Sequence, residues 1–203
     1  MKLFNIATLT LALATSSLAS PITKASNPFE SGIFYPMHFT GSVTPGGPVM
    51  DLYGSVQELV PQIQKIDHGW TPPKGKSPHA PGVVKRYFHG NPICSLGPEY
   101  GTANTGRLEN EVIPYLLAFG VGNCGAKPWS CSRVSCAWDS AIWLCNDHTD
   151  IEIHVSCERL GQAAQHIIDQ PGCTTNFGPF EQQTKGYWED TTGYYVLVAG
   201  SDC

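Results

Sequence analysis

Five side chains that could carry chemistry lie close together in the middle of the chain. They are Asp147, His148, Asp150, Glu152 and His154. Paired carboxylates can serve as acid and base or nucleophile in a glycosidase, and a histidine beside an acid can perform general acid–base catalysis. The cluster therefore raises the hypothesis of a small hydrolase.

The same stretch also fits a simpler pattern. Polar and apolar residues alternate strictly over residues 150–155, which is typical of a strand with one buried face. The apolar positions, Ile151, Ile153 and Val155, then face inward, and the polar positions share the outer face. Because alternation predicts these polar residues without any active site, we favour a solvated strand over a catalytic centre.

Other catalytic and metal-binding patterns are weak. The sequence has no Gly-x-Ser-x-Gly elbow and no phosphate-binding or dinucleotide-binding motif. A zinc site using Cys131 and Cys136 with His148 and His154 is disfavoured, because structural zinc sites use tighter cysteine pairs. We therefore expect no catalytic residues, no metal and no cofactor.

Aromatic residues suggest a binding role instead, because tryptophan and tyrosine serve both as protein hot spots and as platforms for sugar rings. Trp129 follows a proline in a predicted loop and is expected to be exposed, whereas Trp138 and Trp143 are expected to pack in the core. The candidate binding surface comprises Trp129, Asp147, His148 and Trp188.

Hydrophobic spacing predicts the elements that position these residues. Residues 107–119 and 158–170 carry apolar stripes at helical spacing, although Pro114 is expected to shorten or kink the first helix. Residues 133–138 and 141–145 predict a hairpin turning at Asp139 and Ser140, and two further strands follow near the C-terminal end. We expect a small disulfide-rich α+β sandwich, mainly antiparallel, with two helices packed on one face of the sheet.

Cysteine usage points to an oxidising compartment. The eight cysteines are even in number and all follow residue 86, so four disulfides are expected, with a pairing that the sequence does not choose. They are Cys94, Cys124, Cys131, Cys136, Cys145, Cys157, Cys173 and Cys203. Thiols held in disulfides are not thiolates, which also argues against a cysteine nucleophile.

The N-terminal third has a different composition. Residues 20–86 form a proline- and glycine-rich arm that holds ten of the sixteen prolines and no cysteine, and we expect little hydrophobic core from it. The apolar spacing in residues 50–60 predicts a short helix that Pro61 would limit.

Two processing events are expected. Residues 1–19 read as a signal peptide, with one cation, a short apolar run and small residues at Ser17 and Ala19. The pair Lys85 and Arg86 resembles a kexin-type cleavage site, although a solvated charge pair is the plain alternative. Cleavage there would make residues 20–86 a propeptide and residues 87–203 a cysteine-rich domain.

Charge excludes several classes of partner. Residues 87–203 carry five Lys/Arg against thirteen Asp/Glu, whereas the arm has a small positive excess. An acidic domain lacks the basic surface that nucleic acid and anionic lipid require. With no segment of the roughly twenty apolar residues that a membrane helix needs, we expect neither nucleic-acid binding nor membrane insertion.

The central stretch Cys-Ser-Arg-Val-Ser-Cys-Ala-Trp-Asp-Ser-Ala-Ile-Trp-Leu-Cys-Asn-Asp, residues 131–147, resembles a motif of fungal small cysteine-rich secreted proteins. In that group an alanine-rich helix and a final aromatic, valine-rich strand follow. The resemblance implies an α/β sandwich similar to fungal killer toxins and a role as a candidate effector, and it implies no catalytic residues.

The leading expectation is therefore a secreted, non-enzymatic effector-like protein that binds a host or competitor protein. The alternatives are a small secreted hydrolase that uses the Asp/His cluster, and a module that binds cell-wall glycans through exposed tryptophans.

Overall fold

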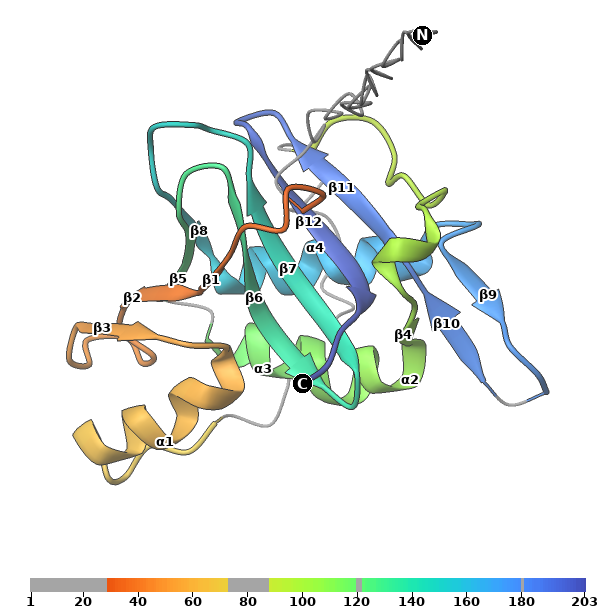
Figure 1. Cartoon of the computed structure of the whole chain (residues 1–203). Helices are drawn as coiled ribbons and strands as arrows, with labels where there is room; N and C mark the ends of the chain where they lie inside the picture. Colours follow the sequence, from red (N-terminus) through yellow and green to blue (C-terminus); the bar gives the residue numbers. More distant parts are fainter. Residues whose placement is uncertain (1–28, 73–87, 120–121, 180) are drawn as a thin grey trace, which may run out of the picture.

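The computed structural model of the chain describes residues 29–72, 88–119, 122–179 and 181–203 (Figure 1). Its strands form three sheets. In spatial order the five-stranded sheet contains β1 (Phe34–Pro36), β6 (Ser130–Ala137), β7 (Ser140–Asn146), β12 (Tyr194–Gly200) and β11 (Gly186–Asp190). The four-stranded sheet contains β3 (Met50–Tyr53), β2 (His38–Gly41), β5 (Gly122–Ala126) and β8 (Ile153–Ser156). The three-stranded sheet contains β4 (Ala103–Asn104), β10 (Gln182–Thr184) and β9 (Thr174–Asn176).

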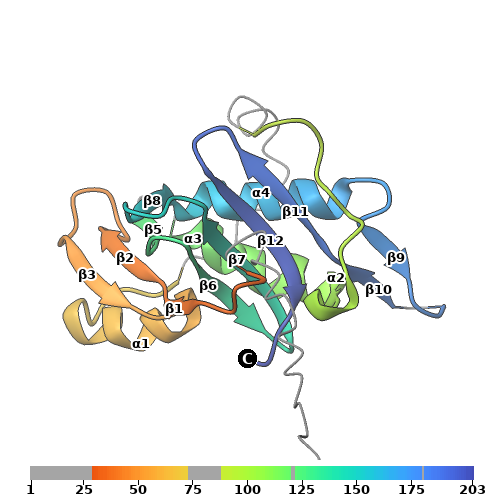
Figure 2. The same ribbon diagram turned by 45° about the horizontal axis from the view of Figure 1, so that its top comes forward.

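Strand β1 runs parallel to β6, and the other paired strands are antiparallel. The helices are α1 (Val56–Ile66), α2 (Thr105–Arg107), α3 (Ile113–Ala118) and α4 (Cys157–Asp169), with a 3-10 turn at Pro98–Tyr100 and a π-helical turn at Leu108–Val112. Helices α3 and α4 lie together behind the five-stranded sheet (Figure 2). The predicted disulfide-rich α+β class, with mainly antiparallel sheets, is confirmed.

Both predicted helices of the cysteine-rich region are present, and the first is interrupted as Pro114 suggested. The π-helical turn precedes α3, and Pro114 occupies one of the first positions of α3. A proline has no N–H to donate into the preceding turn. Here Pro114 directly follows a stretch in which the regular α-helical bonds are already replaced, because the N–H of Ile113 donates to the carbonyl of Leu108. The cap of this helical segment is Asn104, whose side chain accepts a hydrogen bond from the N–H of Arg107.

The predicted hairpin is present as β6 and β7, but its turn lies one residue earlier than expected. Trp138 and Asp139 form the turn, with φ values of 50° and 57°. Positive φ at both central residues matches the two-residue turns that suit the twist of a hairpin. The predicted strand over residues 150–155 is partly wrong, because β8 begins at Ile153 and Ile151 is 49% exposed.

Apolar residues cover both faces of the five-stranded sheet. One face packs against α3, α4 and the four-stranded sheet, and its buried members include Ile142, Leu144 and Val196. The opposite face holds a smaller cluster around Trp143 and Leu197. This second cluster is covered by the residues that precede β1 and by the 3-10 turn, because the ring of Phe29 contacts those of Tyr100 and Trp143.

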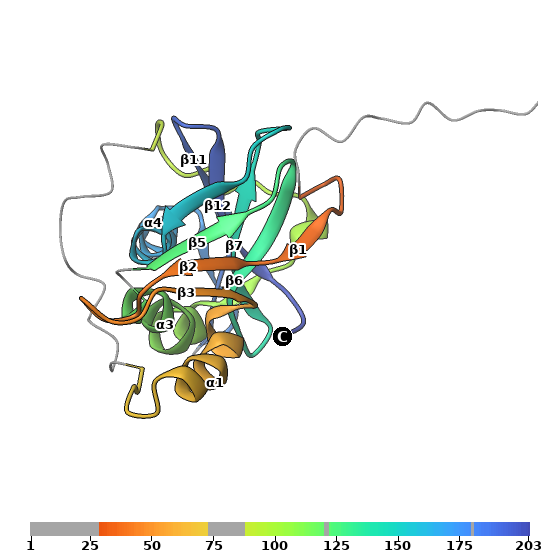
Figure 3. The ribbon, with the colours of Figure 1, turned by 90° about the vertical axis from the view of Figure 1, so that its left-hand side faces the viewer.

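The expectation that the arm contributes little core is wrong for its described part. Phe39, Leu59 and Ile63 are fully buried in the main cluster, and β2 lies between β3 and β5 in the four-stranded sheet (Figure 3). The helix predicted over residues 50–60 is wrong at both ends, because residues 50–53 form β3 and α1 begins at Val56 and continues through Pro61 to Ile66. Burial of an amphipathic face supplies most helix stability in proteins, and here it offsets the backbone hydrogen bond that the proline removes.

All eight cysteines are paired, which confirms the four expected disulfides. The pairs are Cys94–Cys173, Cys124–Cys157, Cys131–Cys145 and Cys136–Cys203. None of them reaches residues 29–72, which contain no cysteine. The predicted signal peptide and the Lys85–Arg86 pair lie outside the described residues.

Candidate functional site

The structure divides the Asp/His cluster into two groups. Asp147 and His148 follow β7 and lie beside the turn that joins β11 to β12, because the N–H of Asp147 donates to the carbonyl of Gly193 at 3.0 Å. Glu152 and His154 instead belong to the edge of the four-stranded sheet at β8. The five residues therefore do not converge on one reacting centre.

Asp147 has the most perturbed carboxyl of the first group. Partial burial raises the pKa of Asp147 to about 6; the negative charge of Glu189 adds to the rise, and His148 opposes it. A proton on a carboxyl near neutral pH is a property of general acids. However, the imidazole Nε2 of His148 lies 2.7 Å from the carbonyl oxygen of Thr192, so the ring is engaged with the backbone rather than with Asp147.

The two tryptophans of the predicted surface behave differently. Trp129 is half-buried in the loop between β5 and β6, and its backbone N–H donates to the carbonyl of His148 at 2.6 Å. Trp188 is 2% exposed and lies between the rings of Phe88 and His166, at centroid distances of 4.4 and 4.2 Å. Trp188 is thus a core residue, and it does not belong to a sugar-stacking surface.

Trp138 is exposed, so the expectation that it packs in the core is wrong. Its side chain is 65% exposed at the tip of the β6–β7 hairpin. The indole Nε1–H donates to the Glu111 carboxylate at 2.7 Å, and the Arg107 guanidinium lies 4.7 Å above the ring and is paired with Glu111. A one-residue shift of a hairpin turn moves a residue out of the ladder, which is why alternation misplaced Trp138.

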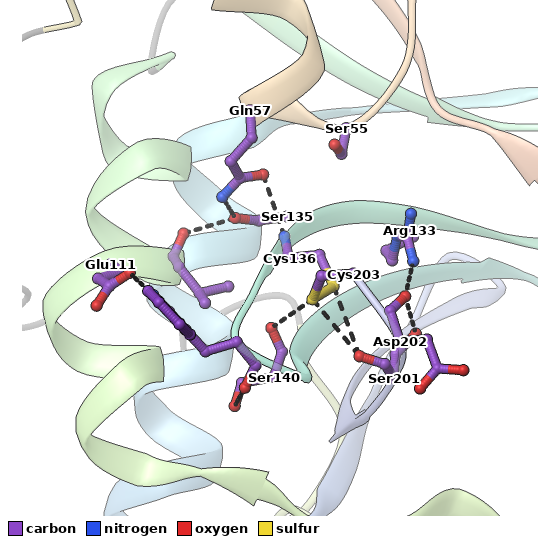
Figure 4. The surroundings of a disulfide bond; sticks show 12 residues. Ser55, Gln57, Glu111, Arg133, Ser135, Cys136, Ser140, Ser201, Asp202 and Cys203 are labelled. Atoms are coloured by element: carbon purple, nitrogen blue, oxygen red, sulfur yellow. Dashed lines mark hydrogen bonds between the residues drawn. A yellow bond between two sulfur atoms is a disulfide. The ribbon is translucent and has the colours of Figure 1, made fainter.

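The turn end of this hairpin is fixed from three directions (Figure 4). The Cys136–Cys203 disulfide ties β6 to the C-terminal residue. From α1, the Gln57 amide donates to the hydroxyl of Ser135 at 2.8 Å and accepts from the N–H of Cys136 at 3.1 Å. The Ser135 hydroxyl in turn donates to the carbonyl of Val112 at 2.8 Å. Trp138 is therefore an exposed ring on a rigid support.

A polar groove is lined by the start of α2 and by the segment that contains β9 and β10. Its volume is about 560 Å³, and it opens broadly to solvent. Amide and carboxylate side chains dominate the lining, which consists of Asn104, Gly106, Glu109, Asn176, Gly178, Pro179, Glu181 and Gln182. Phe177, adjacent in sequence to two of these residues, is 64% exposed. Hydrogen-bonding side chains near an exposed ring are the chemistry that sugars require.

Glu152 and His154 lie beside a histidine of the N-terminal region, residues 29–72. His38 on β2 lies with its Nδ1 2.6 Å from Glu152 and its Nε2 3.0 Å from Asp51. The Nε2 of His154 lies 3.6 Å from the same Glu152 oxygen. Burial lowers the pKa of His38, but the hydrogen bonds and charges of Glu152 and Asp51 outweigh burial and raise it overall. Among the described residues, His38, Glu152 and His154 form the group with the geometry to hold a metal ion.

No protein-family model matches the chain, and no match was found among the curated proteins or the solved structures. Within the described residues, no helix is long and apolar enough to cross a membrane. Multiple disulfides are typical of extracellular proteins.

Proposed function

We propose that the chain is a secreted, non-enzymatic effector-like protein that binds a host or competitor protein outside the cell, with Trp138 as its central contact. The observation that carries this proposal is an exposed tryptophan held in a left-handed backbone conformation on a disulfide-fixed hairpin. The resemblance of residues 131–147 to fungal cysteine-rich secreted proteins agrees with the same class of function.

The conformation of Trp138 supports a functional role because it is unfavourable for a bulky residue. Positive φ brings Cβ close to the backbone, and asparagine or glycine normally occupies such turns. Strained residues of this kind concentrate at binding and catalytic positions. A rigid aromatic ring loses little conformational entropy on binding, which is why tryptophan is enriched among hot spots.

The surroundings of Trp138 suit a protein partner. Arg107 and Glu111 pair with each other and contact the ring, and Asp139 is adjacent in the turn. A central apolar ring with a charged, hydrogen-bonding border is the usual composition of a protein interface. The Arg107–Glu111 pair also holds the ring in one orientation before binding.

The hydrolase alternative is weaker on these grounds. Asp147 and His148 are separated from Glu152 and His154, and His148 is bound to a backbone carbonyl. Asp147 retains a raised pKa, yet the described pocket lined by carboxylates involves Glu109 and Glu181 instead. A hydrolytic activity lost in Asp147→Asn would overturn the non-enzymatic proposal.

The test compares two equally exposed aromatic residues. Labelled chain is incubated with extracellular protein and intact surfaces of candidate host and competitor cells, and binding is titrated for the original chain and for Trp138→Ala and Phe177→Ala. We expect Trp138→Ala to weaken binding at least tenfold and Phe177→Ala to leave it unchanged. Equal binding by the original chain and Trp138→Ala would refute the assigned contact.

A second candidate function is binding of a wall glycan, and the groove beside Phe177 favours it. Sedimentation with insoluble chitin, β-glucan and cellulose would reveal it, with the roles of the two variants reversed. Loss of sedimentation in Phe177→Ala but not in Trp138→Ala would assign glycan binding to the groove. No sedimentation by the original chain would remove this candidate.

A further inference from the structure

We propose that His38, Glu152 and His154 bind a divalent transition-metal ion of the zinc class, which joins the N-terminal region to the cysteine-rich region. This inference is independent of the proposed function. One donor atom of each residue lies within 4.8 Å of the others. Imidazole nitrogens and carboxylate oxygens are ordinary ligands for zinc, copper and nickel.

The two histidines meet because of the register of the four-stranded sheet. His38 on β2 is opposite Gly125 on β5, and Gly125 is in turn opposite His154 on β8. The middle position of this row has no side chain, so the two imidazoles approach each other over it, with ring centroids 5.1 Å apart. A Cβ on Gly125 would lie 2.9 Å from Nδ1 of His154.

The distances between donor atoms fit a metal ion with little movement. With zinc–ligand bonds near 2.0–2.1 Å, the donor atoms of a tetrahedral site lie about 3.3 Å apart. The Glu152 oxygen is 2.6 Å from Nδ1 of His38 and 3.6 Å from Nε2 of His154, which brackets that value. All three donor atoms lie within 4.8 Å of one another, so closing the widest pair to that spacing needs a shift of at most about 1.5 Å.

The remaining nitrogen of each imidazole has its own partner. Nε2 of His38 lies 3.0 Å from the Asp51 carboxylate, and Nδ1 of His154 lies 3.5 Å from the hydroxyl of Thr40. Metal-binding histidines almost always donate their second N–H to a carboxylate or another oxygen, which fixes the tautomer and the ring. This arrangement turns Nδ1 of His38 and Nε2 of His154 toward Glu152, as ligation requires.

The side chains are exposed enough for an ion to reach them. Those of Glu152 and His154 are about one-third exposed, and that of His38 is 14% exposed. Three protein ligands leave a fourth position for water or for a group of a binding partner. The ligands come from β2 and from β8 with its preceding residue, so the ion would tie together two regions that no disulfide connects.

The experiment is a calorimetric titration of the chelator-treated full chain with zinc chloride near neutral pH. We expect one zinc ion per chain, with an affinity that falls at least a hundredfold in His38→Ala and in His154→Ala. Asp51→Asn should lose ten- to a hundredfold, because Asp51 holds His38 without being a ligand. His68→Ala, an exposed histidine outside the cluster, should bind as the original chain does.

Two further variants separate loss of the site from loss of the fold. His154→Gln keeps a polar side chain of similar size. Gly125→Ala keeps every donor, but its Cβ would press on the His154 ring and on the backbone carbonyl of His38. Both should retain the near-ultraviolet circular dichroism of the original chain and bind zinc at least tenfold more weakly. Zinc affinity that is the same in the original chain, His38→Ala and His154→Gln would overturn the proposal.

Discussion

The N-terminal region, residues 29–72, and the cysteine-rich region, residues 88–203, are stabilised in different ways. The cysteine-rich region contains four disulfides, whose partners are 14 to 79 residues apart in sequence. The N-terminal region contains no cysteine, and it is held by strand pairing and by buried apolar side chains. Side chains of both regions nevertheless pack in one hydrophobic core, although only the cysteine-rich region is cross-linked by disulfides.

The difference suggests a division of roles. Disulfides stabilise a protein chiefly by restricting its unfolded chain. Part of the stability of the cysteine-rich region therefore does not depend on how well its side chains pack against the N-terminal region. The N-terminal region completes the core, supports the Trp138 hairpin through Gln57, and supplies His38 and Asp51 to the candidate metal cluster. The attached region therefore contributes to both proposed sites.

The largest expected effect concerns the covalent framework. In the chain-entropy description, replacing Cys94 and Cys173 with serine should lower the free energy of unfolding by about 4.5 kcal/mol, because the closed loop is long. The same change at Cys131 and Cys145, which are 14 residues apart, should lower it by about 3 kcal/mol. Urea unfolding of both double variants measures the difference, and the reverse order would contradict a loop-length origin.

The next effect tests whether the N-terminal region belongs to the core. Leu59→Ala removes a fully buried side chain from α1 and should lower the free energy of unfolding by about 3 kcal/mol. Ile66→Ala, in the same helix but 52% exposed, should change it by less than about 0.5 kcal/mol. Similar urea midpoints for the two variants would show that α1 does not pack as described.

A smaller effect is expected at the start of α1. The Glu58 carboxylate accepts hydrogen bonds from the N–H of Ser55 at 2.6 Å and from its hydroxyl at 2.8 Å; these bonds lower the pKa of Glu58, although partial burial opposes them. Glu58→Ala should lower the free energy of unfolding by about 1 kcal/mol, whereas Glu58→Gln should lose less because an amide oxygen can still accept. Thermal unfolding of the pair at neutral pH distinguishes them.

The smallest effect depends on pH and lies in the cysteine-rich region. Because the folded-state pKa of Asp147 is raised to about 6, the protonated carboxyl is favoured on folding, and its stabilisation is lost as the pH rises through 6. Asp147→Asn resembles the protonated form. It should match the original chain near pH 4 and exceed its stability near pH 7.5, by less than about 1 kcal/mol after solvent screening. A larger gain at pH 4 than at pH 7.5 would contradict the assignment.

The sequence predicted best where the signal is local. The helix at residues 158–170 has a clear apolar stripe and an ending at Pro171, and α4 matches it within a residue at each end. The β6–β7 hairpin was predicted from two β-favouring runs, but the positive φ of Trp138 is unusual for tryptophan and was not anticipated. This one-residue difference hid the exposed ring on which the proposed function rests.

The sequence predicted poorly where contacts are distant. Phe39 is buried by Phe119, which is remote in sequence, and no short-range pattern in a proline-rich segment indicates that contact. His38 and Glu152 are separated by 114 positions, so the candidate metal cluster emerges only when β2 and β8 are placed on either side of β5. Composition identified a cysteine-free segment correctly and underestimated its role in the core.

Residues 29–72 should remain bound to the cysteine-rich region through shared core packing alone after the chain between them is cut. The direct measurement replaces Lys85 and Arg86 with a site for a specific protease, cuts the folded chain, and runs native size exclusion in the presence of a chelator. We expect both fragments to elute together in native buffer and to separate in denaturant without reductant. Release of the N-terminal fragment in native buffer, with the cysteine-rich fragment keeping its near-ultraviolet circular dichroism, would contradict it.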